Sequence, residues 1–249
     1  MTSTEHSAAD AAENDFDELR GFHLFEGVEA GLADSLIANC TSLWFKPGEL
    51  IFEQDNPLTR LMIISRGLVD LSRIEGTREF GVLLLAAHDL LLPGAALFDE
   101  PCLLSARALT RTKICGFPAD VILGAMSQSA RLSFNLLSVT SGQWRMSVRN
   151  TLDASTRTAA QRVGAFLLRL ADLQPHTSPA FLPISKRHLS SRLGITPETL
   201  SRVLQNVAEH GLYLRGRMIF VRDREQIERF CGPDPYIARD ERELGVFAL

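Results

Sequence analysis

The stretch ISKRHLSSRLGITPETLSRVLQNVAEHG, residues 184–211, has the pattern of two helices that meet at a tight turn. Apolar residues such as Leu189 give the first helix one buried face, and Gly194 can adopt the left-handed conformation that ends it. Thr196 is then an N-cap, with Pro197 at the first position of the second helix. The sequence therefore predicts a helix-turn-helix.

The outward face of the second helix carries side chains that can read DNA bases. A carboxylate accepts from cytosine N4, a guanidinium forks onto guanine O6 and N7, and a hydroxyl binds a base or a phosphate. We therefore expect Glu198, Ser201 and Arg202 to read bases. Other side chains on both helices and on the tip of a hairpin at 212–223 are expected to contact phosphates: Lys186, Arg187, Thr196, Thr199, Arg215 and Arg217. The alternative is an ordinary solvated surface.

The distribution of charge favours the DNA-binding interpretation. Residues 157–222 contain ten Lys or Arg residues and three Asp or Glu residues, although the whole chain has a net charge of −4. A basic module on an acidic body is suited to binding phosphates.

The N-terminal half has a different pattern. Residues 1–20 are acidic, small and polar, so we expect a disordered tail and no secretory signal. Residues 21–125 contain many short β-type runs separated by turns, which predict a jelly-roll domain. The most apolar run, 82–98, is interrupted by polar residues, Pro and Gly, which argues against a membrane span. We therefore expect a cytoplasmic protein.

Residues 126–156 form the next predicted segment, a long helix that ends in a hinge. Two apolar seams run along it, and one can cover its own domain while the other pairs with a second copy. We assign the dimer interface to the first seam: Leu132, Leu136, Val139, Gln143 and Met146. The second seam comprises Phe134, Leu137, Ser141, Trp144 and Val148. The alternative is a helix packed wholly within one subunit.

Residues 157–232 complete the chain's DNA-binding part as a winged helix-turn-helix, and 233–249 form a C-terminal tail without an assigned role. A β cup, a long helix and this module together resemble the CRP/FNR superfamily of bacterial transcription regulators. The resemblance covers residues 22–230. Its most specific parts are KPGELIFEQDNP (46–57), LSARALT (104–110) and LPISKRHLSSRLGITPETLSRVL (182–204).

The resemblance implies an α+β fold with a β-roll sensor domain, a long dimerisation helix and a C-terminal winged helix-turn-helix. It also implies a homodimer whose recognition helices enter successive major grooves of an inverted repeat, and contact with RNA polymerase. Glu198, Ser201 and Arg202 match the FNR branch, whose half-sites resemble TTGAT. Pro197 stands where the CRP branch has a further arginine.

The signal that controls the protein is less evident. Members that bind cyclic nucleotides hold the ribose and phosphate with Gly-Glu and Arg-Ser pairs, which map here to Pro93-Gly94 and Leu104-Ser105. A phosphate buried without a guanidinium is very costly, so we do not expect a response to cyclic AMP. Because the four cysteines form no N-terminal group, a 4Fe-4S cluster is not expected either.

Apolar residues replace the polar clamp, and they predict either a filled core or an apolar cavity. We expect the effector pocket, if one is present, to be lined by Leu90, Leu92, Pro93, Gly94, Leu104 and Ser105. One alternative is a haem-based gas or redox sensor, with His23 or His88 as the iron ligand. Another is a sensor of a small aromatic or apolar molecule. The sequence has no phosphate loop, nucleophile elbow or metal motif, so we do not expect an enzyme.

Overall fold

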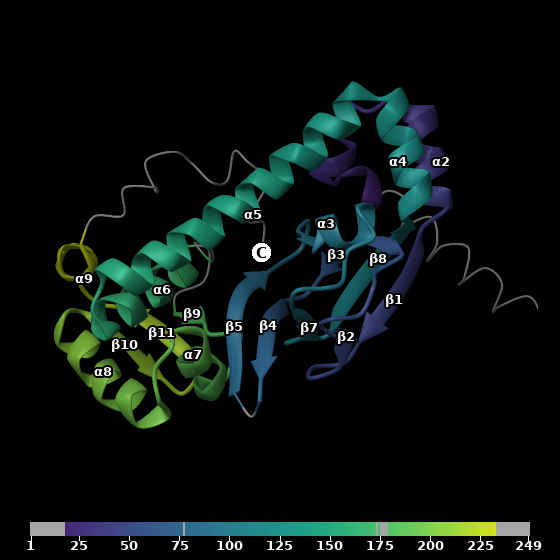
Figure 1. Cartoon of the computed structure of the whole chain (residues 1–249). Helices are drawn as coiled ribbons and strands as arrows, with labels where there is room; N and C mark the ends of the chain where they lie inside the picture. The colour runs from purple at the N-terminus through teal and green to yellow at the C-terminus, as the bar shows by residue number, and fades with distance from the viewer. Residues whose placement is uncertain (1–17, 77, 173, 175–178, 233–249) are drawn as a thin grey trace, which may run out of the picture.

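Two antiparallel four-stranded sheets form the cup of the molecule. Its labelled strands lie in the blue and teal part of Figure 1. The computed structural model describes residues 18–76, 78–172, 174 and 179–232. One sheet has the order β1-β8-β3-β6 and the other β2-β7-β4-β5. The strands are β1 (Thr41–Phe45), β2 (Leu50–Phe52), β3 (Arg60–Arg66), β4 (Val69–Glu75), β5 (Arg78–Leu85), β6 (Leu90–Leu91), β7 (Ser105–Ala108) and β8 (Thr112–Pro118).

The inner faces of the two sheets enclose an apolar cluster. Successive side chains of a strand point to opposite faces, so alternate residues of each strand enter the cup. Ile64 and Ile114 come from one sheet, and Val69 and Leu71 from the other, and each is at most 3% exposed. The short helix α3 (Pro93–Leu97) adds two alanines to this cluster, although the sequence suggested only strands and turns there.

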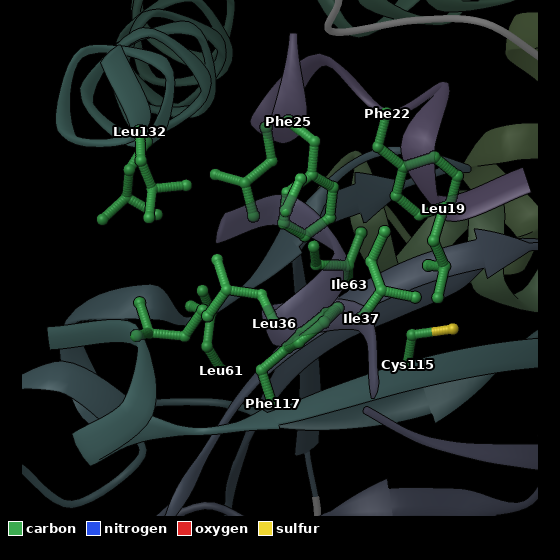
Figure 2. Close-up of a cluster of buried hydrophobic side chains, with 14 of the residues drawn as sticks. Leu19, Phe22, Phe25, Leu36, Ile37, Leu61, Ile63, Cys115, Phe117 and Leu132 are labelled. Atoms are coloured by element: carbon green, nitrogen blue, oxygen red, sulfur yellow. The ribbon is translucent and has the colours of Figure 1, made fainter. Parts of the chain in front are cut away.

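A second apolar cluster lies outside the cup, under the helices (Figure 2). Leu61 of β3 and Phe117 of β8 are both 0% exposed and pack against Leu36 of α2 (Ala30–Ala38) and Leu132 of α5 (Ala130–Thr156). The 3-10 helix η1 (His23–Phe25) and α4 (Ala119–Gln128) complete the cover. The outer face of one sheet is thereby protected from water.

The N-terminal segment contributes to this cluster as well. Residues 18–20 were assigned to a disordered tail, but they are helical and Leu19 is 3% exposed. Glu18 accepts hydrogen bonds from Ser65 (3.0 Å) and Arg66 (2.8 Å). Residues 18–20 are therefore ordered, contrary to the prediction from their composition. The remainder of the predicted N-terminal tail, and the predicted C-terminal tail 233–249, lie outside the described residues.

The long helix begins later than the seam pattern indicated. Ser129 has extended backbone angles and separates α4 from α5, and its side chain caps α5 by accepting from the Leu132 N–H (3.2 Å). From there α5 runs along the cup to the C-terminal domain (Figure 1). Arg157, at its C-terminal end, is again extended.

The seam that we assigned to the dimer interface faces the chain's own cup. Its five residues are buried in the single chain: Leu132, Leu136, Val139, Gln143 and Met146. Gln143 donates to the Leu90 carbonyl (2.8 Å), which ties α5 to β6. Assigning this seam to the dimer interface was wrong, because helical periodicity identifies two apolar faces without saying which one packs on the cup. The other seam is exposed: Phe134 is 61%, Leu137 63% and Trp144 67% exposed.

The C-terminal domain has its own apolar core. Val163, Leu189, Leu200 and Ile219, which come from four different elements, are each at most 1% exposed. The elements are α6 (Ala159–Asp172), β9 (Ala180–Phe181), α7 (Lys186–Arg192), α8 (Pro197–Glu209), β10 (Leu212–Arg215), β11 (Met218–Val221) and α9 (Arg224–Cys231). Strand β9 pairs with β11 in antiparallel orientation. No helix in the described part of the chain could span a membrane.

A buried carboxyl lies just before β6. Asp89 is 1% exposed; one carboxylate oxygen accepts from the Ala86 N–H (2.9 Å), and the other has no hydrogen-bond partner among the described residues. Burial raises the pKa of Asp89 from 3.8 to about 7, although the hydrogen bond from Ala86 opposes the shift. The folded chain therefore holds a proton that the unfolded chain releases. This contribution to stability is complete below pH 3.8 and is lost as the pH rises towards 7.

We predict that Asp89→Asn flattens this part of the pH dependence. Between about pH 5 and pH 7 the wild-type free energy of unfolding should fall by about 2 kcal/mol more than that of the variant. Urea unfolding at the two pH values measures the difference. Asp99→Asn, at an exposed turn, is the matched control and should behave as the wild type. Parallel curves for wild type and Asp89→Asn would contradict this assignment.

Candidate nucleic-acid interface

The turn between α7 and α8 has the conformation that the sequence predicts. Gly194 has φ = 64°, in the left-handed region that favours glycine. The Ile195 N–H donates to the Ser190 carbonyl (3.0 Å), which closes the corner. Leu200 and Val207 are 1% and 0% exposed and anchor α8 on the domain core. One face of α8 is therefore fixed, and the opposite face is left to solvent.

The start of α8 is capped by its own side chains. Thr196 accepts from the Thr199 N–H (3.2 Å), and Pro197 occupies the first turn. Glu198 hydrogen-bonds to its own backbone N–H and to Thr196, and these bonds lower the pKa of the carboxyl. Glu198 is consequently a carboxylate, which can only accept hydrogen bonds. Thr196 and Thr199, expected to contact phosphates, are both engaged in this cap.

The three expected base-reading side chains lie together on the exposed face. Glu198, Ser201 and Arg202 are all exposed, and they occupy positions three and four apart on α8. Ser201 donates to the Pro197 carbonyl (3.2 Å) and keeps its hydroxyl lone pairs available. Within the described residues the Arg202 guanidinium has no hydrogen-bond or ion-pair partner. The face thus presents one acceptor, one hydroxyl and one forked donor.

The expected phosphate-binding cations divide into two groups. Lys186, Arg187 and Arg215 have exposed positions and no ion pair among the described residues. Arg217 is different, because it donates to the carbonyls of Leu182 (3.0 Å) and Pro183 and its guanidinium lies 4.7 Å from the centre of the Phe181 ring. Arg217 therefore connects the β10–β11 hairpin, called the wing below, to the β9 segment. The prediction that Arg217 contacts a DNA phosphate needs correction.

The cup has no guanidinium at the positions of the cyclic-nucleotide clamp. Leu104 packs against the interior cluster, and the Ser105 hydroxyl accepts from the Gln54 N–H (3.0 Å). Arg73 lies close by, but it donates to the Leu103 carbonyl (2.9 Å) and to Asp55 (3.1 Å). The polar groups at this end of the cup thus bind one another.

The expected pocket residues do not all face the interior. Leu90 belongs to the outer cluster under α5, while its neighbour Leu91 enters the cup, because consecutive strand residues point to opposite faces. Assigning Leu90 to the effector pocket was therefore wrong. Leu92, at the start of α3, has φ = 41°, an unusual conformation for a bulky residue. Pro93 is buried and Gly94 half-buried within α3.

The histidines considered as haem ligands are engaged outside the interior cluster. His23 Nδ1 lies 2.8 Å from a Glu26 carboxylate oxygen, and the His88 ring lies 4.4 Å from the Phe22 ring. Burial is the main cause that lowers the pKa of His88. Neither histidine belongs to the apolar cluster between the sheets. Among the described residues, no three His, Cys, Asp or Glu side chains form a metal-binding group.

Comparisons with known proteins agree with this arrangement. The Crp-like helix-turn-helix domain matches residues 161–230, and the cyclic nucleotide-binding domain matches residues 42–129. The transcriptional activator protein anr of Pseudomonas aeruginosa is 24% identical over 192 residues, which cover 75% of this chain and 79% of that protein. The chain belongs to the CRP/FNR family of transcription regulators.

Other CRP/FNR proteins are similar over most of their length. A CRP-like cAMP-activated global transcriptional regulator of Mycobacterium tuberculosis is 23% identical over 212 residues, covering 83% of this chain and 95% of the relative. The structure of FixK2 from Bradyrhizobium japonicum has a TM-score of 0.70 at 23% identity and covers 78% of this chain and 98% of that one. The two sequence relatives are transcription regulators, and this CRP/FNR chain shares the fold of the FixK2 structure.

The Thr196 cap gives a stability prediction for this CRP/FNR chain. Thr196→Ala removes the acceptor for the Thr199 N–H and should lower the free energy of unfolding by about 1 kcal/mol. Thr196→Ser keeps a hydroxyl at the same place and should stay within a few tenths of a kcal/mol of the wild type. Urea denaturation followed by circular dichroism measures both. Equal losses for Ala and Ser would show that the cap does not stabilise α8.

Proposed function

We propose that this CRP/FNR regulator acts as a homodimer on an FNR-like inverted repeat. Each recognition helix α8 enters a major groove, and the two grooves lie one helical turn apart on one face of the duplex. The proposal includes a signal other than a cyclic nucleotide, and contact with RNA polymerase as the family implies. The protein then works in the bacterial cytoplasm.

The face of α8 is the observation that carries the proposal. Its exposed carboxylate, hydroxyl and guanidinium provide the hydrogen-bonding groups needed to distinguish bases in a major groove. Lys186, Arg187 and Arg215 supply positive charge on α7 and on the wing, where it can contact phosphates. An enzyme or a purely structural module would not need this combination.

The exposed seam of α5 supports the dimer. Phe134, Leu137 and Trp144 are each more than 60% exposed, and they recur at the spacing of a single helix face. A contiguous apolar face of this kind marks an interaction site. A second copy of the chain is the proposed occupant, because a two-fold axis beside the two α5 helices would also pair the two α8 helices.

The interior of the cup supports a signal other than cyclic AMP. Leu104 and Pro93 stand where the family's clamp has Arg and Gly, and the neighbouring Arg73 already binds Asp55 and the Leu103 carbonyl. The interior cluster is apolar, which favours a small apolar or aromatic effector over a charged one.

We predict that Arg202 controls specificity while Lys186 controls overall affinity. Arg202→Ala should weaken binding to a TTGAT inverted repeat by about 1–3 kcal/mol per half-site, with little change for a scrambled duplex. Lys186→Ala should weaken binding to both duplexes alike and reduce the dependence on salt by about one phosphate contact. Fluorescence anisotropy titration at several salt concentrations measures both effects. Equal loss on the two duplexes for Arg202→Ala would contradict its role in reading bases.

We predict that a charge in the exposed α5 seam separates the dimer. Trp144→Glu should give a folded monomer, because the side chain is 67% exposed in the single chain. Its affinity for the inverted repeat should fall by about tenfold or more, since the second half-site is then no longer bound from the same particle. Leu43→Glu, 54% exposed on β1, is the control and should remain dimeric. Sedimentation velocity distinguishes the states, and a dimeric Trp144→Glu would refute the interface.

A further inference from the structure

The C-terminal DNA-binding domain, residues 159–232, is called the head below. It contacts the cup in a way that the proposed function does not require. Helix α7 packs on strand β5 of the same chain, as the green and blue ribbons in Figure 1 show. Arg192, the last residue of α7, pairs with Asp70 of β4. The side chains are only 7% and 8% exposed. Beside them, Ser191 donates a hydrogen bond to the Glu79 carbonyl.

The two domains approach closely at a glycine. A Cβ atom added to Gly81 would lie 3.3 Å from both Cα and Cβ of Arg192. Gly81 does not have a positive φ, so the close approach explains the absence of a side chain there better than backbone conformation does. Leu84 and Leu109 of the cup also pack against the core of the head. The contact between the head and the cup, called the seat below, therefore combines apolar packing with one buried ion pair.

The ion pair restricts the orientation of the head relative to the cup. Burial lowers the pKa of Arg192 while Asp70 raises it. The guanidinium keeps its charge, so this buried cation needs Asp70 as its partner. A buried charge that loses its partner is strongly unfavourable, whereas apolar contacts tolerate small shifts. The pair is therefore satisfied only when α7 occupies one position on β5.

The head is also attached through the end of α5. Asp153 near that end pairs with Arg157 (3.2 Å) and with Arg169 of α6 (3.1 Å). A single attachment would leave the head free to rotate about the joint at Arg157. A second attachment at a distance from the first removes that freedom, so the joint and the seat together fix how α8 is held relative to α5.

We propose that the Asp70–Arg192 pair, seated at Gly81, is a positioning element that sets the spacing between the two DNA half-sites. The inference rests on the proposed dimer. Because α5 carries the proposed partner contact, the position of each head relative to its own α5 determines the separation of the two recognition helices. Asp70 and Arg192 touch no base, and they act through α8.

The test compares inverted repeats whose spacers differ in steps of one base pair. Wild-type protein should prefer one spacer over its neighbours by about tenfold or more, because both heads bind together only at the matching separation. Asp70→Asn and Arg192→Gln should reduce that preference to about threefold or less. Their affinity for a duplex with a single half-site should stay within about twofold of the wild type, which a merely unfolded head would not show.

Two further variants make the result unambiguous. Gly81→Ala keeps both charges but places a Cβ atom 3.3 Å from Arg192 Cα, so α7 must shift by a few tenths of an ångström and the spacer preference should fall. Arg187→Gln removes an arginine of the same helix that has no such partner, and it should weaken binding to duplexes of every spacer length equally.

If Asp70→Asn does not fold, Gly81→Ala provides the same test. A wild-type preference that persists in Asp70→Asn, Arg192→Gln and Gly81→Ala would overturn the inference. If the wild type preferred no inverted repeat at any spacing, the proposed dimeric function itself would fail.

Discussion

The packing of α5 on the cup is the contact on which the rest of the molecule depends. Its inner face covers both apolar clusters of the cup, and polar side chains on that face are matched to particular carbonyl groups. Asn135 donates to the carbonyls of Leu24 (3.1 Å) and Glu26 (2.8 Å), and Gln143 donates to that of Leu90 (2.8 Å). A shift along the helix would leave these buried groups unpaired, so the hydrogen bonds fix the register that apolar contacts alone would allow to slide.

Because the inner face of α5 is fixed on the cup, only the outer face can contact another molecule. Because the inner seam is used within the chain, Phe134, Leu137 and Trp144 remain exposed beside it. The same helix leads directly into the DNA-binding domain, so a contact made on its outer face is transmitted to the position of α8. The positive charges of the head have two different uses. The head carries exposed cations on α7, α8 and the wing, while Arg192 is withdrawn from that surface and used to seat the head on the cup.

Much of this could be predicted from the sequence, for identifiable reasons. The turn at Gly194, the cap at Thr196 and the exposed residues of α8 follow from local rules about backbone conformation and helical periodicity. The two sheets follow from short alternating runs separated by turns. The resemblance to the CRP/FNR family, which rested on the same segments, is confirmed by both matched domains.

What could not be predicted depends on residues that are far apart in the chain. Periodicity shows that α5 has two apolar faces, but only the folded cup decides that the face of Leu132 is the inner one. Arg217 resembled a phosphate-binding residue because its partners, the carbonyls of Leu182 and Pro183, are 35 and 34 positions away. Arg192 contributes to the basic charge of residues 157–222, but its partner Asp70 is 122 positions away. Such pairings leave no local pattern in a single sequence.

In the proposed dimer, two copies joined along α5 present two matched recognition helices to one face of a duplex. Methylation interference at guanine N7 on an inverted-repeat duplex detects this arrangement, because that atom lies in the major groove. We expect two symmetric sets of interfering guanines, one helical turn apart on the same face. A single set of guanines, or two sets on opposite faces of the duplex, would contradict it.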